Sequence, residues 1–197
     1  MKLLIIFCFV SFSSSIIIEC EFKKDNWKII DEIYLCGLKN WPSITLPGTL
    51  ITSATGTYQP STNHYNVQAF ESIDRQIYYI PHGLVQIFPN LIALTIWNGR
   101  IKEIHQNDFQ QFPNLIYLNL GMNDIEILEN DLFKFNYHLE FIRFFVNKIK
   151  EIHPSIFDNL NNLQWLDLEY NQCVNKEMKN RLNVLKFIDE LKEICQE

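Results

Sequence analysis

The chain has 197 residues, of which 47% are hydrophobic and 20% are charged, and its formal net charge is −6. This length and composition fit a single globular domain. The sequence contains no run of basic residues, which argues against nucleic acid and acidic membrane surfaces as partners, because both are bound by clustered Lys and Arg.

A secretory signal peptide is predicted over Met1–Ser15. Lys2 precedes an apolar run over residues 3–10, and Ser13 and Ser15 are small residues suited to cleavage. A membrane anchor is the alternative, but the run is short for a span and serines interrupt its extension toward Ile18. We therefore expect a secreted, extracellular protein with no membrane insertion after the signal is cleaved.

An N-terminal cap is predicted over residues 16–66. The segment Cys20–Leu38 is rich in aliphatic and aromatic residues and predicts a small hairpin. The segment Ser43–Gly56 is predicted to be extended, and Thr57–Asn66 is predicted to be a polar loop that contains Pro60.

A pattern with a period of 24 residues follows the cap and decides the expected fold. Each copy has apolar residues at its first position and at +3, +5, +10 and +13, Asn or Gly at +8, and Phe at +18. Four copies begin at Leu91, Leu115, Leu139 and Leu163, and a weaker copy begins at Val67. The repeats therefore span 67–172, as 67–90, 91–114, 115–138, 139–162 and a partial copy over 163–172. Such a period predicts a solenoid, in which each unit packs only against its neighbours.

The copy Leu115-Ile-Tyr-Leu118-Asn-Leu120-Gly-Met-Asn123-Asp-Ile125 resembles the extracellular type of leucine-rich repeat. Similar units occur in insect secreted proteins and in the ectodomains of Toll-type and Slit-type proteins. The resemblance implies an α/β repeat solenoid, a short leucine-rich-repeat horseshoe with a concave parallel β-sheet. It also implies recognition of another protein, in innate immunity or in receptor–ligand or adhesion contacts.

The polar position of the pattern predicts a ladder of asparagines inside the solenoid, because an amide side chain both donates and accepts hydrogen bonds. The rungs would be Asn123, Asn147 and Asn171, whereas Gly99 and Arg75 occupy this position in the preceding copies. The aromatic position would fill the convex half of the core with Phe109, Phe133 and Phe157.

A C-terminal cap is predicted over residues 173–197. Lys176–Ile194 has the spacing of an amphipathic helix that covers the last repeat. Its apolar face is predicted to contain Met178, Leu182, Leu185, Ile188 and Leu191.

The cysteines predict one disulfide in each cap. Four remain once Cys8 leaves with the signal, and an even number in a secreted chain predicts disulfides with three conceivable connectivities. Because both edges of a solenoid need covering, the economical pairing is Cys20–Cys36 and Cys173–Cys195, each contributing about 3 kcal/mol. A zinc site is the alternative, but neither pair has metal-ligand spacing, so we expect no metal and no cofactor.

The outward side chains of the repeat strands predict a binding surface on the concave face. Exposed aromatic patches with polar neighbours are typical of interfaces. Two alternatives stay open: the aromatic residues stabilise the sheet by neighbour pairing, with Arg143–Asp167 as a cross-strand ion pair, or the face buries a homodimer. The predicted contact residues are Trp97, Tyr117, Asn119, Phe141, Arg143, Phe145, Trp165, Asp167, Glu169 and Tyr170.

Catalysis is not indicated by any motif. His105 and His153 occupy equivalent positions two repeats apart, about 10 Å, which is too far for one metal ion. No nucleophile motif and no phosphate-binding glycine loop is present. The prediction is therefore a binding protein and not an enzyme, with a self-associating structural protein and a co-receptor subunit as alternatives.

Overall fold

The computed structural model describes residues 14–27, 30–39 and 43–195. The predicted signal peptide lies outside these residues, except for Ser14 and Ser15. The elements are β1 (Ser15–Trp27), β2 (Asp31–Leu38), β3 (Leu50–Thr55), η1 (His64–Asn66), β4 (Ala69–Ile73), α1 (Leu84–Ile87), β5 (Ala93–Trp97), α2 (Gln106–Gln110), β6 (Tyr117–Asn119), β7 (Ile127–Leu128), β8 (Phe141–Arg143), β9 (Glu151–Ile152), β10 (Trp165–Asp167), β11 (Glu177–Lys179) and α3 (Arg181–Ile194).

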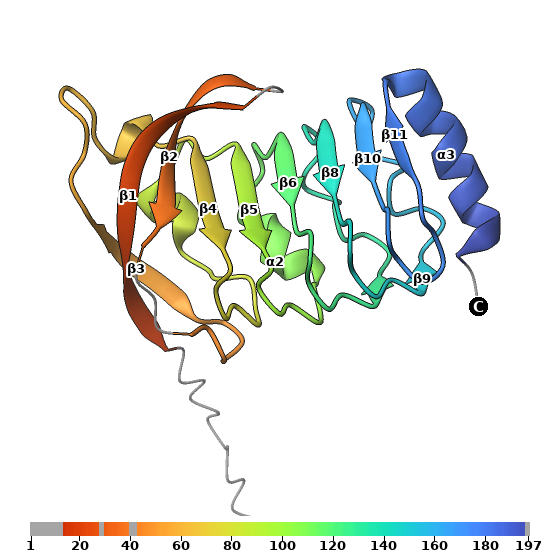
Figure 1. The fold of residues 1–197 in the computed structure, drawn as a ribbon, viewed down its shortest axis with the longest axis horizontal. Coiled ribbons are helices and arrows are strands. Elements are labelled where there is room, and N and C mark those ends of the chain that lie inside the picture. The colour runs from red at the N-terminus through yellow and green to blue at the C-terminus, as the bar shows by residue number, and fades with distance from the viewer. Residues whose placement is uncertain (1–13, 28–29, 40–42, 196–197) are drawn as a thin grey trace, which may run out of the picture.

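One nine-stranded sheet runs the length of the molecule in the order β11-β10-β8-β6-β5-β4-β2-β1-β3 (Figure 1). The five repeat strands β4, β5, β6, β8 and β10 are parallel and in register, so residues 24 apart are neighbours, as Tyr117 and Phe141 are. At the two ends, β1 pairs antiparallel with β2 and β11 pairs antiparallel with β10. The fold is the predicted short solenoid with a capping segment at each end.

The repeat pattern builds the core because alternate strand residues point to opposite faces of the sheet. Leu118 and Leu120 point inward and are fully buried, as are their equivalents in the neighbouring repeats. The predicted phenylalanines stack along the convex half, with ring centroids 5.4 Å apart for Phe109–Phe133 and 6.5 Å apart for Phe133–Phe157. Each turn therefore buries its apolar side chains against the next turn.

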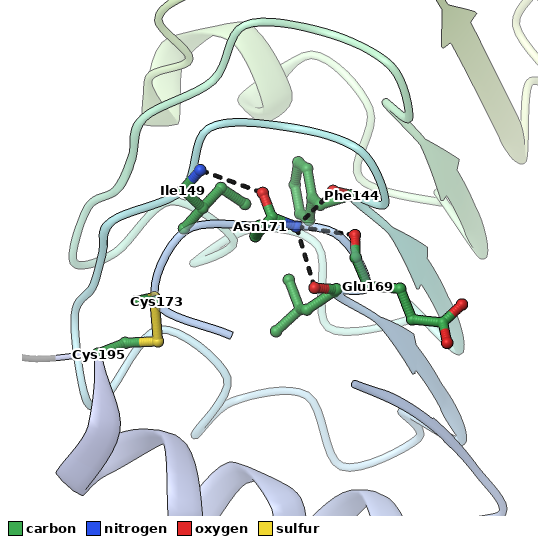
Figure 2. Close-up of a disulfide and its surroundings, with 7 residues drawn as sticks. Phe144, Ile149, Glu169, Asn171, Cys173 and Cys195 are labelled. Atoms are coloured by element: carbon green, nitrogen blue, oxygen red, sulfur yellow. Dashed lines mark hydrogen bonds between the residues drawn. A yellow bond between two sulfur atoms is a disulfide. The ribbon is translucent and has the colours of Figure 1, made fainter. Parts of the chain in front are cut away.

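The asparagines hydrogen-bond the backbones of adjacent turns. Asn147 donates to the carbonyls of Leu120 (2.9 Å) and Phe144 (3.0 Å), and its Oδ1 accepts from the amide of Ile125 (3.1 Å). Figure 2 shows the equivalent contacts of Asn171, which lies near the Cys173–Cys195 disulfide. Each side chain joins one turn to the turn before it.

The ladder stops at Gly99 for a steric reason. A Cβ atom at this position would lie 2.8 Å from Cγ2 of Ile96 and 2.9 Å from Oδ1 of Asn123. Asn123 instead accepts hydrogen bonds from the amides of Gly99 and Ile101, both at 3.0 Å. One repeat earlier, Arg75 donates to the carbonyl of Lys39 at 2.7 Å and so connects the first turn to the N-terminal cap.

Both caps are crosslinked as the economical pairing predicts. Cys20 and Cys36 join β1 to β2 across the hairpin, with a Cα–Cα distance of 5.1 Å. Cys173 and Cys195 join the last repeat to the end of α3, with a Cα–Cα distance of 5.2 Å. Helix α3 lies against the C-terminal end of the sheet, and the β1–β2 hairpin with β3 lies at the other end (Figure 1).

The prediction for the C-terminal helix is wrong in its start and in part of its buried face. Residues Glu177–Lys179 form β11, with Met178 opposite Leu166, and the helix begins only at Arg181. Leu182 and Leu185 are 70% and 41% exposed. The buried residues are Val184, Phe187, Ile188 and Leu191. The predicted apolar face and the observed buried face both have helical spacing, and they share Ile188 and Leu191. The position of β11, which pairs antiparallel with β10, determines which face packs against the core.

A pair of substitutions tests this face. We expect Val184→Ala to lower the free energy of unfolding by about 2 kcal/mol, since it opens a cavity in the core. Leu185→Ala, one residue along the same helix, should change it by less than about 0.5 kcal/mol. Urea denaturation of both variants measures the difference, and a larger loss for Leu185→Ala would show that the predicted stripe was right.

Candidate concave binding face

The ten predicted contact residues all lie on β5, β6, β8 and β10 or in the turns that follow these strands. They occupy the sheet face turned away from the main core, which we call the concave face. Register pairs such as Asn119–Arg143 and Arg143–Asp167 place equivalent residues side by side along the sheet. The structure therefore gathers these residues on one face, but their exposure differs strongly.

The predicted exposure is wrong for the residues in the middle of this face. Tyr117, Asn119, Phe141 and Asp167 are 7%, 9%, 9% and 1% exposed. Only Tyr170, at 65%, is fully exposed. The remaining residues, which are Trp97, Arg143, Phe145, Trp165 and Glu169, are half-buried.

The N-terminal hairpin causes part of this burial. The β1–β2 hairpin arches over the starts of the first repeat strands (Figure 1), and Trp27 at the end of β1 lies 5.0 Å from Tyr117, centroid to centroid. The small side chains of Ala69 and Ala93 leave room for it. Ile33 and Leu35 of β2 complete a second apolar cluster with Ala69, Ala93, Tyr117 and Phe141. The predicted neighbour pairing along the sheet is also present, with ring centroids 6.4 Å apart for Tyr117–Phe141 and 6.5 Å apart for Phe141–Trp165.

The C-terminal half of the face centres on Arg143. Its guanidinium carbon lies 4.7 Å from the Phe145 ring centroid and 5.3 Å from that of Trp165, and its Nε donates to Oδ2 of Asp167 at 3.1 Å. Gly121 makes this arrangement sterically feasible, since a Cβ there would lie 2.1 Å from the Phe145 ring. The guanidinium of Arg143 therefore lies within cation–π distance of two partly accessible aromatic rings.

A row of left-handed residues borders this half. The residue at position +7 of each copy has a positive φ, which is 55° at Asp74, 54° at Asn98, 57° at Met122, 52° at Val146 and 56° at Tyr170. Asn tolerates this conformation, whereas a β-branched residue there is a steric outlier. Two apolar residues occupy this position in spite of the backbone conformation, and their side chains are exposed: Met122 is 37% exposed and Val146 is 38% exposed. The last three repeats thus present apolar side chains where a polar residue would fit the backbone better.

A shallow, open cavity of about 270 Å³ lies on the N-terminal half of the face, where Trp27 of the hairpin forms part of its lining. Glu71, Thr95 and Asn119 are register neighbours on three successive strands. The cavity is lined by these three residues with Ile73 and the aromatic side chains of Trp27, Trp97 and Tyr117. Trp97, Tyr117 and Asn119 are among the contact residues predicted from the sequence, whereas Trp27 and Glu71 were not predicted. Trp27 lies in the cap, and no repeat pattern signals that the cap reaches a strand of the third repeat.

The carboxyl group of Glu71 is the charged group of this cavity. Burial raises the pKa of Glu71, and the Coulombic effects of Lys23, which lowers it, and of Asp25, which raises it, are smaller. Glu71 forms no salt bridge with any other residue in the described part of the chain. Its charge therefore lacks a contacting cation there.

The comparison with known families names the repeat. Residues 89–144 match the family model described as leucine rich repeat. The repeat units within this segment are leucine-rich repeats. The matched segment contains β5, α2, β6 and β8, and equivalent contacts continue the leucine-rich-repeat architecture through β10.

Several solved structures are similar to part of this chain. Toll from the Drosophila Toll–Spatzle complex is 18% identical with a TM-score of 0.45, and the match covers 66% of this chain and 21% of Toll. TLR13 from its complex with ssRNA13 is 17% identical with a TM-score of 0.46, covering 65% and 22%. An internalin, InlF from Listeria monocytogenes, is 20% identical with a TM-score of 0.40, covering 63% and 41%. The chain thus spans about a fifth of the first two proteins, and no curated protein matches it.

Over residues 14–27, 30–39 and 43–195, no group of three or more His, Cys, Asp and Glu residues could hold a metal ion. None of the helices in these ranges is long and apolar enough to cross a membrane. His105 lies on the surface within 3.4 Å of Glu129 and 3.9 Å of Glu103.

Proposed function

We propose that the protein is a secreted leucine-rich-repeat protein that binds another protein through the C-terminal half of its concave face. The proposed contact surface consists of Met122, Arg143, Phe145, Val146, Trp165 and Tyr170. It leaves out Tyr117 and Phe141, because their side chains are buried. Innate immunity and receptor–ligand or adhesion contacts are the roles that the extracellular resemblance suggests.

The observation that carries the proposal is Val146. Its backbone has φ of 52° and its side chain is 38% exposed, so the position combines conformational strain with apolar exposure. Strain of this kind costs about 1–3 kcal/mol and is concentrated at functional sites. Asn98 stands at the equivalent position of an earlier repeat, where it relieves the strain. An exposed valine at this strained position is explained if a partner covers it.

The neighbouring groups have the composition of an interaction centre. Trp, Tyr and Arg dominate binding hot spots, and all three types occur here as Trp165, Tyr170 and Arg143. Arg143 is held in place by Asp167 and two aromatic rings, so binding would cost little further side-chain ordering. The disulfides and the predicted signal support a secreted, oxidising location.

Three alternative functions predict different behaviour. A homodimer would bury the same surface against a second copy, and a co-receptor subunit would hold it against a larger membrane protein. An enzyme would need convergent titratable groups, and the titratable residues of this surface are Tyr170 and Arg143, which is paired with the buried Asp167.

The test is affinity capture from extracellular fluid of the source organism, with the mature protein as bait. A double variant, Val146→Asn with Tyr170→Ser, removes the exposed apolar groups, and Asn suits the left-handed backbone, so the fold should remain intact. The matched control is Tyr137→Ser, which removes a 55% exposed aromatic residue outside the concave face. We expect the wild type and the control to retain a protein that the double variant loses.

Two results would contradict the proposal. Equal capture by all three baits would move the interface elsewhere on the molecule. A concentration-dependent mass in light scattering that the double variant abolishes would assign the surface to self-association instead.

A further inference from the structure

The cavity beneath the hairpin is separate from the proposed contact surface, and it has its own chemistry. Three aromatic side chains, those of Trp27, Trp97 and Tyr117, line it together with one carboxylate, that of Glu71. Thr95 and Asn119 add neutral polar groups. A ligand of this cavity must therefore be compatible with aromatic rings, one carboxylate and neutral polar groups.

Anionic and purely apolar ligands suit this cavity poorly. An anion would be repelled by Glu71 and by the negative faces of the aromatic rings. An apolar ligand would remove water from the Glu71 carboxylate without replacing the lost interactions, which is costly for a charged group. A cation would gain from both features, since ring faces attract ammonium groups and a carboxylate pairs with them.

The protein supplies no contacting cation of its own within its described residues. Lys23 is close enough to influence Glu71 electrostatically, but the two form no salt bridge. Arg143, which lies near Tyr117, is paired with Asp167 at 3.1 Å. The Glu71 carboxylate is therefore available to a ligand.

We propose that this cavity binds an organic ammonium group, supplied either by a small free cation or by a lysine-type side chain of a peptide. The cavity volume of about 270 Å³ lies just below the roughly 300–1,000 Å³ of sites for drug-sized molecules. A small ammonium group is therefore a better match for it than a drug-sized ligand. The side chains of Trp27, Trp97 and Tyr117 form the aromatic wall, and Glu71 neutralises the charge. Trp27 belongs to the hairpin, so the site exists only while the cap lies over the repeats.

The experiment compares choline with its uncharged isostere 3,3-dimethylbutan-1-ol, using the purified, oxidised protein. Binding is followed by the indole ¹⁵N–¹H signals of Trp27 and Trp97, assigned with Trp27→Phe and Trp97→Phe. Trp165 lies outside the cavity and serves as an internal reference. We expect choline to shift the first two signals saturably and to bind at least about tenfold more tightly than the alcohol.

Two variants separate the site from general charge effects. Glu71→Gln should reduce the preference for choline over the alcohol several-fold, and the aromatic wall should retain the remainder. Glu193→Gln removes one negative charge from the exposed surface of α3 and should leave it unchanged. Thermal melts confirm that both variants are folded. Equal binding of the two probes by the wild type, or an undiminished preference in Glu71→Gln, would overturn the proposal.

A second pair of probes distinguishes the sources of the ammonium group. Acetylated trimethyllysine amide is compared with acetylated norleucine amide, which lacks the charge. Binding of the lysine derivative alongside choline supports a peptide side chain as ligand, and binding of choline alone supports a free cation. Because none of these probes requires the unidentified protein partner, failure here leaves the test of the concave contact surface unaffected.

Discussion

We expect Asn147→Leu to lower the free energy of unfolding by at least about 3 kcal/mol, since it breaks three hydrogen bonds inside the solenoid. Asn147 is 8% exposed, and its side chain contacts the backbones of two adjacent turns. Leucine has a similar size but can neither donate nor accept. The carbonyls of Leu120 and Phe144 and the amide of Ile125 would lose these side-chain partners, and a buried polar group left unpaired costs about 1–3 kcal/mol.

The matched control is Asn159→Leu, which changes an exposed asparagine in a turn of the same repeat. It should alter the free energy of unfolding by less than about 0.5 kcal/mol. Urea denaturation monitored by circular dichroism measures both variants. Similar losses for the two substitutions would show that the ladder contributes nothing specific to stability.

Reduction of both disulfides should lower the melting temperature by more than about 10 °C. The bridges connect residues separated by 16 and 22 positions, and closing loops of this length stabilises a protein by about 3 kcal/mol each in the chain-entropy model. For a chain of this size, 1 kcal/mol corresponds to about 2–4 °C. The Cys20–Cys36 bridge fixes the N-terminal hairpin, and the Cys173–Cys195 bridge holds the end of α3 against the last repeat.

Differential scanning calorimetry with and without a reductant measures this effect, with mass spectrometry to verify complete reduction. The double variants Cys20→Ala/Cys36→Ala and Cys173→Ala/Cys195→Ala divide the loss between the two ends. A fully reduced protein that melts at the temperature of the oxidised one would refute the stabilising role of the caps.

The repeat region could be predicted from the sequence because each buried position recurs every 24 residues. Leu118, Asn123 and Phe133 are placed by local periodicity, and their equivalents repeat the same environment in each turn. The disulfide pairs followed from the same reasoning, since a solenoid has two edges to cover. These features depend on contacts between adjacent turns.

The incorrect predictions concern residues that contact distant parts of the chain, or segments in which two different residue sets have the same helical spacing. Tyr117 was expected to be exposed, but its burial depends partly on Trp27, a residue 90 positions earlier that no repeat pattern places nearby. Leu185 and Val184 are both compatible with a helical stripe, and only the pairing of β11 with β10 decides between them. The cavity was not predicted because Trp27 belongs to the N-terminal cap and Glu71 to the first repeat, and no sequence pattern relates the two.

The contact between Trp27 and Tyr117 also affects the order in which the repeats unfold. In a solenoid, units that interact only with their neighbours can open one after another from an end. The hairpin instead spans β4 and β5 and reaches β6, so the cap cannot detach without exposing side chains of three strands at once. The N-terminal half is thereby joined into one cooperative unit, whereas the C-terminal turns retain the freedom to open singly once α3 has left.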